Sequence, residues 1–167
     1  MRRLLACRTL HEGKPLLFAL VLLVGAVAVG LVEARKRSQD VVRVNAVFEP
    51  AAADGWRRLL VTLRIQPGWH IYANPVGPTE LHDVQTEISP ATADTIFLRV
   101  DYPRGKVQQS EFLGSYRIYE GTVTIPVLVR HKGGSTGPAG IVVRFQACSD
   151  RTCLPPARVR LMASPSR

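Results

Sequence analysis

Cys148 and Cys153 are the residues of this sequence whose chemistry is most specific. Four residues separate them, and Pro155 and Pro156 follow closely. A cysteine pair can serve as a structural disulfide, as part of a metal site, or as a dithiol that exchanges with other disulfides. The compartment of the chain and the elements around the pair must decide among these uses.

The first 37 residues predict a signal peptide or a membrane anchor. Basic residues precede an uncharged apolar run over residues 15–32, and Ala34 lies in a plausible cleavage site. A run of about 18 apolar residues is also long enough for a marginal membrane span. Both alternatives place the rest of the chain outside the cytoplasm, where neighbouring cysteines normally oxidise. Cys7 precedes the apolar run, and we expect no role for it.

The spacing of the pair leaves all three uses open. A disulfide between Cys148 and Cys153 would close a short loop and stabilise the fold by only about 2 kcal/mol. His70, His82 and His131 do not stand at a familiar ligand spacing from the cysteines, so we expect no metal site and no cofactor. A thioredoxin-type site needs Cys-x-x-Cys at the start of a helix, which the two prolines oppose. We therefore expect a carrier dithiol that reacts with a better nucleophile on a partner.

Alternating apolar and polar residues dominate the remainder of the chain. The segments with this pattern are 41–49, 56–66, 121–130, 140–147 and 157–163. Period two with one apolar face is typical of antiparallel sheets that cover a core. The sequence therefore predicts an all-β fold, an immunoglobulin-like antiparallel β-sandwich over residues 38–167. Pro126 predicts an edge strand or a bulge, and the alternation places Cys148 on the exposed side of its strand.

The charge of the exported part limits the classes of partner. From Arg35 onward the chain has 18 basic and 11 acidic residues, a net charge of +7. A basic surface suits an acidic protein or anionic lipid. The basic residues are scattered and form no run interleaved with aromatic residues, so we expect no binding of nucleic acid.

Three stretches together resemble a known family. Residues 145–161 (FQACSDRTCLPPARVRL) resemble the cysteine segment of the N-terminal periplasmic domain of the bacterial thiol:disulfide interchange protein DsbD. Residues 66–77 (QPGWHIYANPVG) resemble the aromatic strand that backs the cysteines of that family. Residues 110–129 (SEFLGSYRIYEGTVTIPVLV) resemble its cap loop and the strand that follows. The resemblance covers roughly residues 40–163.

The resemblance implies an immunoglobulin-like domain that passes electrons from a membrane-linked thioredoxin-like module to periplasmic proteins. Such partners include disulfide isomerases and cytochrome c maturation proteins. Cys153 would form the mixed disulfide with partners, and Cys148 would resolve it. Because the sequence ends at Arg167, we expect either that its electron donor is a separate protein or that the scaffold serves another use. The further site residues implied by the resemblance are Phe112, Glu111 and Gly114 in the cap and Tyr72 and His70 beside the cysteines.

Two functional hypotheses follow. The first is a periplasmic thiol-disulfide oxidoreductase, soluble or anchored to the inner membrane by residues 15–32, that relays reducing equivalents between thioredoxin-like redox proteins. The second is a non-catalytic β-sandwich module that binds a protein partner and contains a structural disulfide. The reduction potential separates them, because structural disulfides have potentials below about −300 mV and relay pairs have higher ones.

Overall fold

The computed structural model describes residues 36–49, 56–134 and 138–163. Cys7 and the apolar run of residues 15–32 lie outside these ranges, so the predicted signal peptide or anchor is not described. No helix within the described ranges combines the length and the hydropathy that a membrane span requires.

The described chain is built almost entirely from antiparallel strands. In chain order they are β1 Val42–Phe48, β2 Arg57–Ile65, β3 His70–Tyr72, β4 Glu87–Pro90, β5 Thr95–Val100, β6 Lys106–Ser110, β7 Gly114–Tyr119, β8 Thr122–His131, β9 Ala139–Phe145, β10 Ala147–Cys148 and β11 Ala157–Ala163. They form three sheets, with the strand orders β1-β2-β8-β5, β11-β9-β4 and β10-β3-β7-β6. The predicted all-β antiparallel fold is confirmed.

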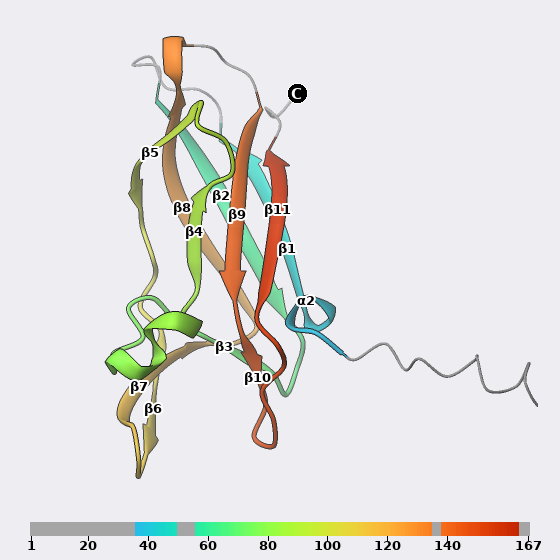
Figure 1. Ribbon diagram of the computed structural model, residues 1–167, viewed down its shortest axis with the longest axis vertical. Helices are drawn as coiled ribbons and strands as arrows, with labels where there is room; N and C mark the ends of the chain where they lie inside the picture. Colours follow the sequence, from blue (N-terminus) through green and yellow to red (C-terminus); the bar gives the residue numbers. More distant parts are fainter. Residues whose placement is uncertain (1–35, 50–55, 135–137, 164–167) are drawn as a thin grey trace, which may run out of the picture. The chain divides into compact units, whose positions relative to one another are not determined.

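Two of the sheets enclose the hydrophobic core. In Figure 1 the sheet β1-β2-β8-β5 lies behind the sheet β11-β9-β4, and the third sheet lies at the lower end of the molecule. The apolar faces expected from the sequence are turned inward. Fully buried side chains include Leu59, Val61 and Leu63 of β2, Ile125 and Val127 of β8, and Ile141, Val143 and Phe145 of β9. The rigid sandwich thus carries the small third sheet, which contains Cys148, at one end.

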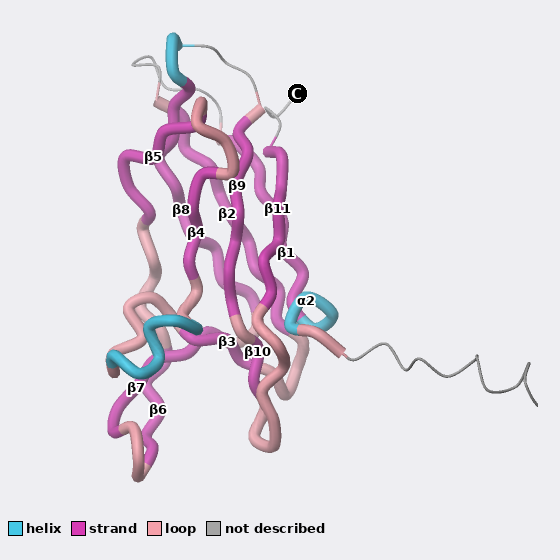
Figure 2. Tube along the Cα trace, viewed as in Figure 1, coloured by secondary structure: helices cyan, strands magenta, loops and turns pink. Residues whose placement is uncertain are grey.

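Helical turns are short and lie at the periphery (Figure 2). They are α2 Ser38–Val41 and the 3-10 turns Thr79–Val84 (η1) and Lys132–Gly134 (η2). Figure 1 shows α2 at the same end of the molecule as β10, next to the starts of β1 and β11. This position makes α2 part of the support for the cysteine segment.

Pro126 does not mark an edge strand. Its strand β8 lies between β2 and β5, and the register shift falls in β5, between Phe97 and Arg99. The Pro126 carbonyl accepts a hydrogen bond from the Asp101 N–H at 2.8 Å, just past the end of β5. Since the carbonyl and the nitrogen of one strand residue point to the same side, the proline nitrogen faces the place where β5 ends. The missing N–H therefore interrupts no ladder, and the prediction of an edge or a bulge at Pro126 is wrong.

Candidate functional site

Cys148 and Cys153 form a disulfide across a tight hairpin that follows β9. Their Cα atoms are 4.0 Å apart, and the two residues form an antiparallel bridge. Inside the pair, the Ser149 N–H donates a hydrogen bond to the Thr152 carbonyl at 2.8 Å. Outside it, the Leu154 N–H donates to the carbonyl that precedes Cys148 at 2.9 Å. The backbone closes this hairpin without help from the sulfur atoms, so we expect the thiols to stay adjacent after reduction.

The two cysteines differ in exposure. Cys148 is 2% exposed, whereas Cys153 is an exposed residue. The prediction that Cys148 lies on an exposed face is therefore wrong. The alternation of β9 ends at Phe145, and Cys148 belongs to a new strand, β10, which pairs with β3 in another sheet. An approaching disulfide or thiol consequently meets Cys153 first.

Tyr72 and His70 of β3 lie beside Cys148. The Tyr72 hydroxyl donates a hydrogen bond to the Cys148 Sγ, with 3.7 Å between the two atoms. His70 is the register partner of Cys148 across the β3–β10 pair. The His70 and Tyr72 rings meet edge to face, with centroids 6.1 Å apart. The buried sulfur is thus bordered by one hydroxyl donor and one imidazole.

The ionisation of these two side chains follows from their surroundings. Burial raises the pKa of Tyr72, and the nearby Tyr116 raises it further. Burial lowers the pKa of His70, and the carboxylates of Glu120 and Asp150 partly oppose this change. Tyr72 therefore stays a hydroxyl donor, and His70 is mainly neutral at pH 7. His70, Glu120 and Asp150 line a hollow of about 350 Å³.

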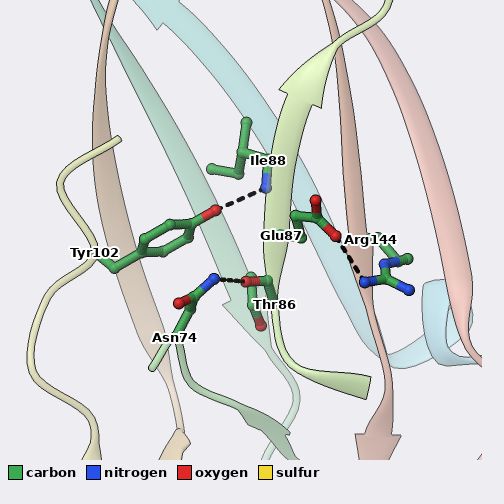
Figure 3. Close-up of polar contacts among 6 residues, drawn as sticks. All are labelled: Asn74, Thr86, Glu87, Ile88, Tyr102 and Arg144. Atoms are coloured by element: carbon green, nitrogen blue, oxygen red, sulfur yellow. Dashed lines mark hydrogen bonds and ion pairs between the residues drawn. The ribbon is translucent and has the colours of Figure 1, made fainter. Parts of the chain in front are cut away.

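Thr86 holds strand β3 in position through two hydrogen bonds. This residue is fully buried, and its N–H and hydroxyl donate to the Tyr72 carbonyl at 2.9 and 2.6 Å. The Asn74 side-chain amide in turn donates to the Thr86 carbonyl at 3.0 Å (Figure 3). These bonds determine where β3, and hence the Tyr72 hydroxyl, stands relative to Cys148.

The segment after Thr86 is anchored on both sides. In Figure 3 the Ile88 N–H points at the Tyr102 hydroxyl, to which it donates at 2.9 Å. On the other side Glu87 forms an ion pair with Arg144 of β9, with 2.6 Å between oxygen and nitrogen. These contacts hold Thr86 in place at the start of β4 and so stabilise the support of β3.

Ser38 of α2 joins the two strands of the cysteine hairpin at its base. Its side chain is fully buried. The hydroxyl donates to the Pro155 carbonyl at 2.7 Å and accepts a hydrogen bond from the Ala147 N–H at 2.9 Å. Ala147 immediately precedes Cys148, and Pro155 lies two residues after Cys153. One side chain thus fixes the spacing of the two chain segments that carry the sulfur atoms.

The residues predicted to cap the pair form the turn between β6 and β7. Gly114, the first residue of β7, has a φ of +69°, in the left-handed region that favours glycine. Glu111 is exposed, and Phe112 is 94% exposed. β6 and β10 lie at opposite edges of the third sheet. In this structure the Phe112 ring is open to solvent, so its shielding of the cysteines stays a prediction.

Three supporting residues were not found from the sequence. Ser38 and Thr86 lie in segments for which no motif was recognised, and Tyr116 lies within residues 110–129, where only the cap residues were named. Their roles arise from contacts between distant segments, such as the 109-residue separation between Ser38 and Ala147. No group of three or more potential metal ligands among His, Cys, Asp and Glu occurs in the described part of the chain.

An immunoglobulin-like β-sandwich with a disulfide hairpin at one end defines the class of protein, a domain suited to thiol-disulfide exchange. Comparisons with known proteins identify its family. The family model described as "Thiol:disulfide interchange protein DsbD, N-terminal" matches residues 38–164. The chain therefore belongs to the family of DsbD N-terminal domains.

Curated relatives give the same result. The chain is 29% identical over 143 residues to the thiol:disulfide interchange protein DsbD of Escherichia coli O157:H7 and, equally, to that of strain K12. The match covers 84% of this chain but only 22% of either relative. The chain thus spans about a fifth of the length of these proteins.

Solved structures share the fold. The reduced N-terminal domain of Neisseria meningitidis DsbD superposes with a TM-score of 0.51 at 19% identity, over 77% of this chain and 89% of that one. The N-terminal periplasmic domain of ScsB from Proteus mirabilis gives a TM-score of 0.50 at 20% identity, over 75% of this chain and 48% of that one.

Proposed function

We propose that this protein relays reducing equivalents by thiol-disulfide exchange through Cys148 and Cys153. The observation that carries the proposal is the unequal exposure of the pair: Cys153 is exposed, and Cys148 is 2% exposed. A hairpin that the backbone closes by itself also lets the disulfide open without loss of the fold. Membership of the DsbD N-terminal family supports the same chemistry.

The exchange proceeds in two steps. In the reduced protein the Cys153 thiolate attacks a disulfide of the acceptor, which forms a mixed disulfide and releases one acceptor thiolate. The Cys148 thiolate then attacks the Cys153 sulfur, which releases the second acceptor thiolate and forms the Cys148–Cys153 disulfide. Two electrons pass to the acceptor, and its two thiolates take up protons. A donor dithiol that attacks Cys153 reverses the sequence and restores the reduced pair.

Tyr72 and His70 act on the buried sulfur in this scheme. A hydroxyl that donates to the Cys148 Sγ stabilises negative charge there, both when Cys148 attacks and when it leaves. A mainly neutral His70 adds no fixed positive charge beside the sulfur. We assign Phe112, Glu111 and Gly114 to a cap that closes over the pair in the absence of a partner.

The partners and the location complete the proposal. We place the domain, residues 38–167, in the periplasm, and we assign residues 1–37 to a signal peptide or an inner-membrane anchor. The partners are thioredoxin-like redox proteins, soluble or membrane-bound. The family name and the periplasmic ScsB relative support this placement.

The reduction potential of the pair tests the function. The protein is equilibrated in glutathione redox buffers, and the fraction of disulfide is read by alkylation and mass spectrometry. We expect a potential above about −300 mV, with the fold retained in both states. A lower potential, or unfolding on reduction, would refute the relay and favour a binding module with a structural disulfide.

The assignment of the two cysteines has its own test. The variant Cys148→Ser should accumulate a mixed disulfide with a thioredoxin-like protein, because no resolving thiol remains. The matched variant Cys153→Ser should accumulate far less, since its remaining sulfur is buried. Equal trapping by the two variants would contradict the assigned roles.

A further inference from the structure

An open groove of about 630 Å³ runs between the edge strands β1 and β11. Figure 1 shows these strands next to each other, with α2 at their lower ends. Gln39 and Asp40 of α2 line the groove together with residues of both strands. The groove therefore begins beside the helix that supports the cysteine hairpin.

The walls of the groove are strongly basic. Arg43 of β1 and Arg158 and Arg160 of β11 line it, and all three are exposed. None of the three forms an ion pair with a residue of the described chain. Asp40 is the single acidic residue of the lining, and its carboxylate accepts a hydrogen bond from a backbone N–H. The groove thus has an excess of positive charge.

The strand pairing places like charges directly opposite each other. Arg43 lies opposite Arg64 of β2, and Arg158 lies opposite Arg144 of β9. Such pairs destabilise a sheet unless a counter-charge is near. Glu87 supplies that counter-charge to Arg144 at 2.6 Å. No described acidic residue forms an ion pair with Arg43, Arg64 or Arg158, so these exposed guanidinium groups are available to carboxylates of another molecule.

The groove and the redox site share the support of α2. Ser38, which precedes the groove-lining residues of α2, binds both strands of the cysteine hairpin at its base. Arg158 follows Cys153 by five residues, a span of at most about 17 Å of extended chain. A protein that reacts at Cys153 can therefore also reach the groove.

We propose that this groove binds an acidic segment of the protein that exchanges its disulfide with Cys153. The inference rests on the proposed function and adds a recognition site to it. Guanidinium groups pair with carboxylates through two parallel hydrogen bonds, and three of them line this groove. The groove opens beside the cysteine hairpin, and the molecule that exchanges its disulfide at Cys153 is a protein, so a peptide segment rather than a lipid is brought to it. The occupant is thus a protein segment rich in Asp and Glu.

Peptide binding tests the groove without any redox step. The full chain is titrated with a fluorescent cysteine-free octapeptide of alternating Glu and Ala, and with its Gln-and-Ala counterpart, at two salt concentrations. We expect the acidic peptide to bind at least tenfold more tightly at low salt and to lose affinity as salt is raised. Equal binding of the two peptides would overturn the proposal.

Paired substitutions locate the binding. Arg158→Gln with Arg160→Gln should weaken binding of the acidic peptide roughly tenfold, since each exposed ion pair contributes up to about fivefold in affinity. The matched control is Arg104→Gln with Lys132→Gln, which removes the same charge at two exposed residues outside the groove lining. The control should bind like the unaltered protein. If both pairs of substitutions weaken binding equally, net charge explains the affinity and the groove does not.

Two further measurements separate this inference from its rival and from the proposed function. Vesicles of phosphatidylcholine mixed with phosphatidylglycerol probe a lipid occupant, because anionic bilayers attract clusters of basic residues. Loss of vesicle binding in the Arg158 and Arg160 variant, with no preference for the acidic peptide, would overturn the proposal.

The second measurement uses peptides with a glutathionylated cysteine about five residues from the acidic or the neutral stretch. The dithiol form of the protein should reduce the mixed disulfide of the acidic peptide faster than that of the neutral peptide. Binding of the acidic peptide without any exchange would refute the proposed function and leave the groove as a binding site.

Discussion

Ser38→Ala is the substitution for which the structure makes the sharpest prediction. The serine hydroxyl is fully buried and bonds to Pro155 and Ala147, on the two sides of the cysteine pair. Alanine keeps the Cβ atom but removes the oxygen, and with it both hydrogen bonds. The Pro155 carbonyl keeps a longer bond, 3.4 Å, from the backbone N–H of residue 38. The buried Ala147 N–H loses its acceptor, the Ser38 hydroxyl.

The expected magnitude follows from that unpaired donor. A buried polar group left without a partner costs about 1–3 kcal/mol. We therefore expect the oxidised Ser38→Ala variant to lose about 2 kcal/mol of its free energy of unfolding. For a domain of about 130 residues this corresponds to a fall in Tm of about 7 °C.

The reduction potential should change in a defined direction. In the reduced variant the hairpin can loosen and admit water to the Ala147 N–H, so Ser38→Ala should cost less in that state than in the oxidised one. The variant disulfide is then less stable relative to the dithiol, and its potential rises. If about half of the 2 kcal/mol is relieved, the rise is on the order of 20 mV.

Urea unfolding of the oxidised and reduced forms, together with glutathione equilibration, measures these quantities. Thr124→Ala serves as the control, because it removes a hydroxyl from an exposed Thr62–Thr124 contact of 3.2 Å. We expect the control to stay within about 0.5 kcal/mol of the unaltered protein and to leave the potential unchanged. A Ser38→Ala variant as stable as this control in both oxidation states would refute the reasoning.

Further predictions concern Tyr72 and His70 beside Cys148 and Phe112 in the cap. Tyr72→Phe removes the hydroxyl that donates to Cys148 and should slow exchange about two- to fivefold in stopped-flow kinetics, with little change in stability; an unchanged rate would contradict the role of Tyr72. The lowered pKa of His70 means that the unfolded chain binds a proton more readily than the folded one. The free energy of unfolding should therefore fall as the pH drops below about 6.5. His70→Gln should make this dependence on pH less steep in urea titrations at successive pH values. An equally steep dependence in the variant would argue against burial of a neutral imidazole. Phe112→Ala should leave the free energy of unfolding within about 0.5 kcal/mol, because the ring is 94% exposed. If the cap closes in solution, the same variant reacts faster with glutathione, and an unchanged rate would refute shielding.

Several features of the fold and the site were predictable because they depend on local patterns. The alternation in residues 56–66 and 121–130 predicted β2 and β8 with the correct buried faces. The position of Pro126 was misjudged, because the end of the neighbouring β5 cannot be read from the sequence of β8.

The sequence by itself determined that this chain forms antiparallel strands and carries one cysteine pair suited to exchange. Both conclusions rest on residue types and spacings within short segments. Only the tertiary structure decided that Cys148 is buried and Cys153 exposed, since a strand 76 residues away supplies the Tyr72 contact. It also decided that Ser38 supports the hairpin from 109 residues away. Burial and hydrogen bonding between distant segments depend on how the sheets pack against one another, and local sequence patterns do not specify that packing.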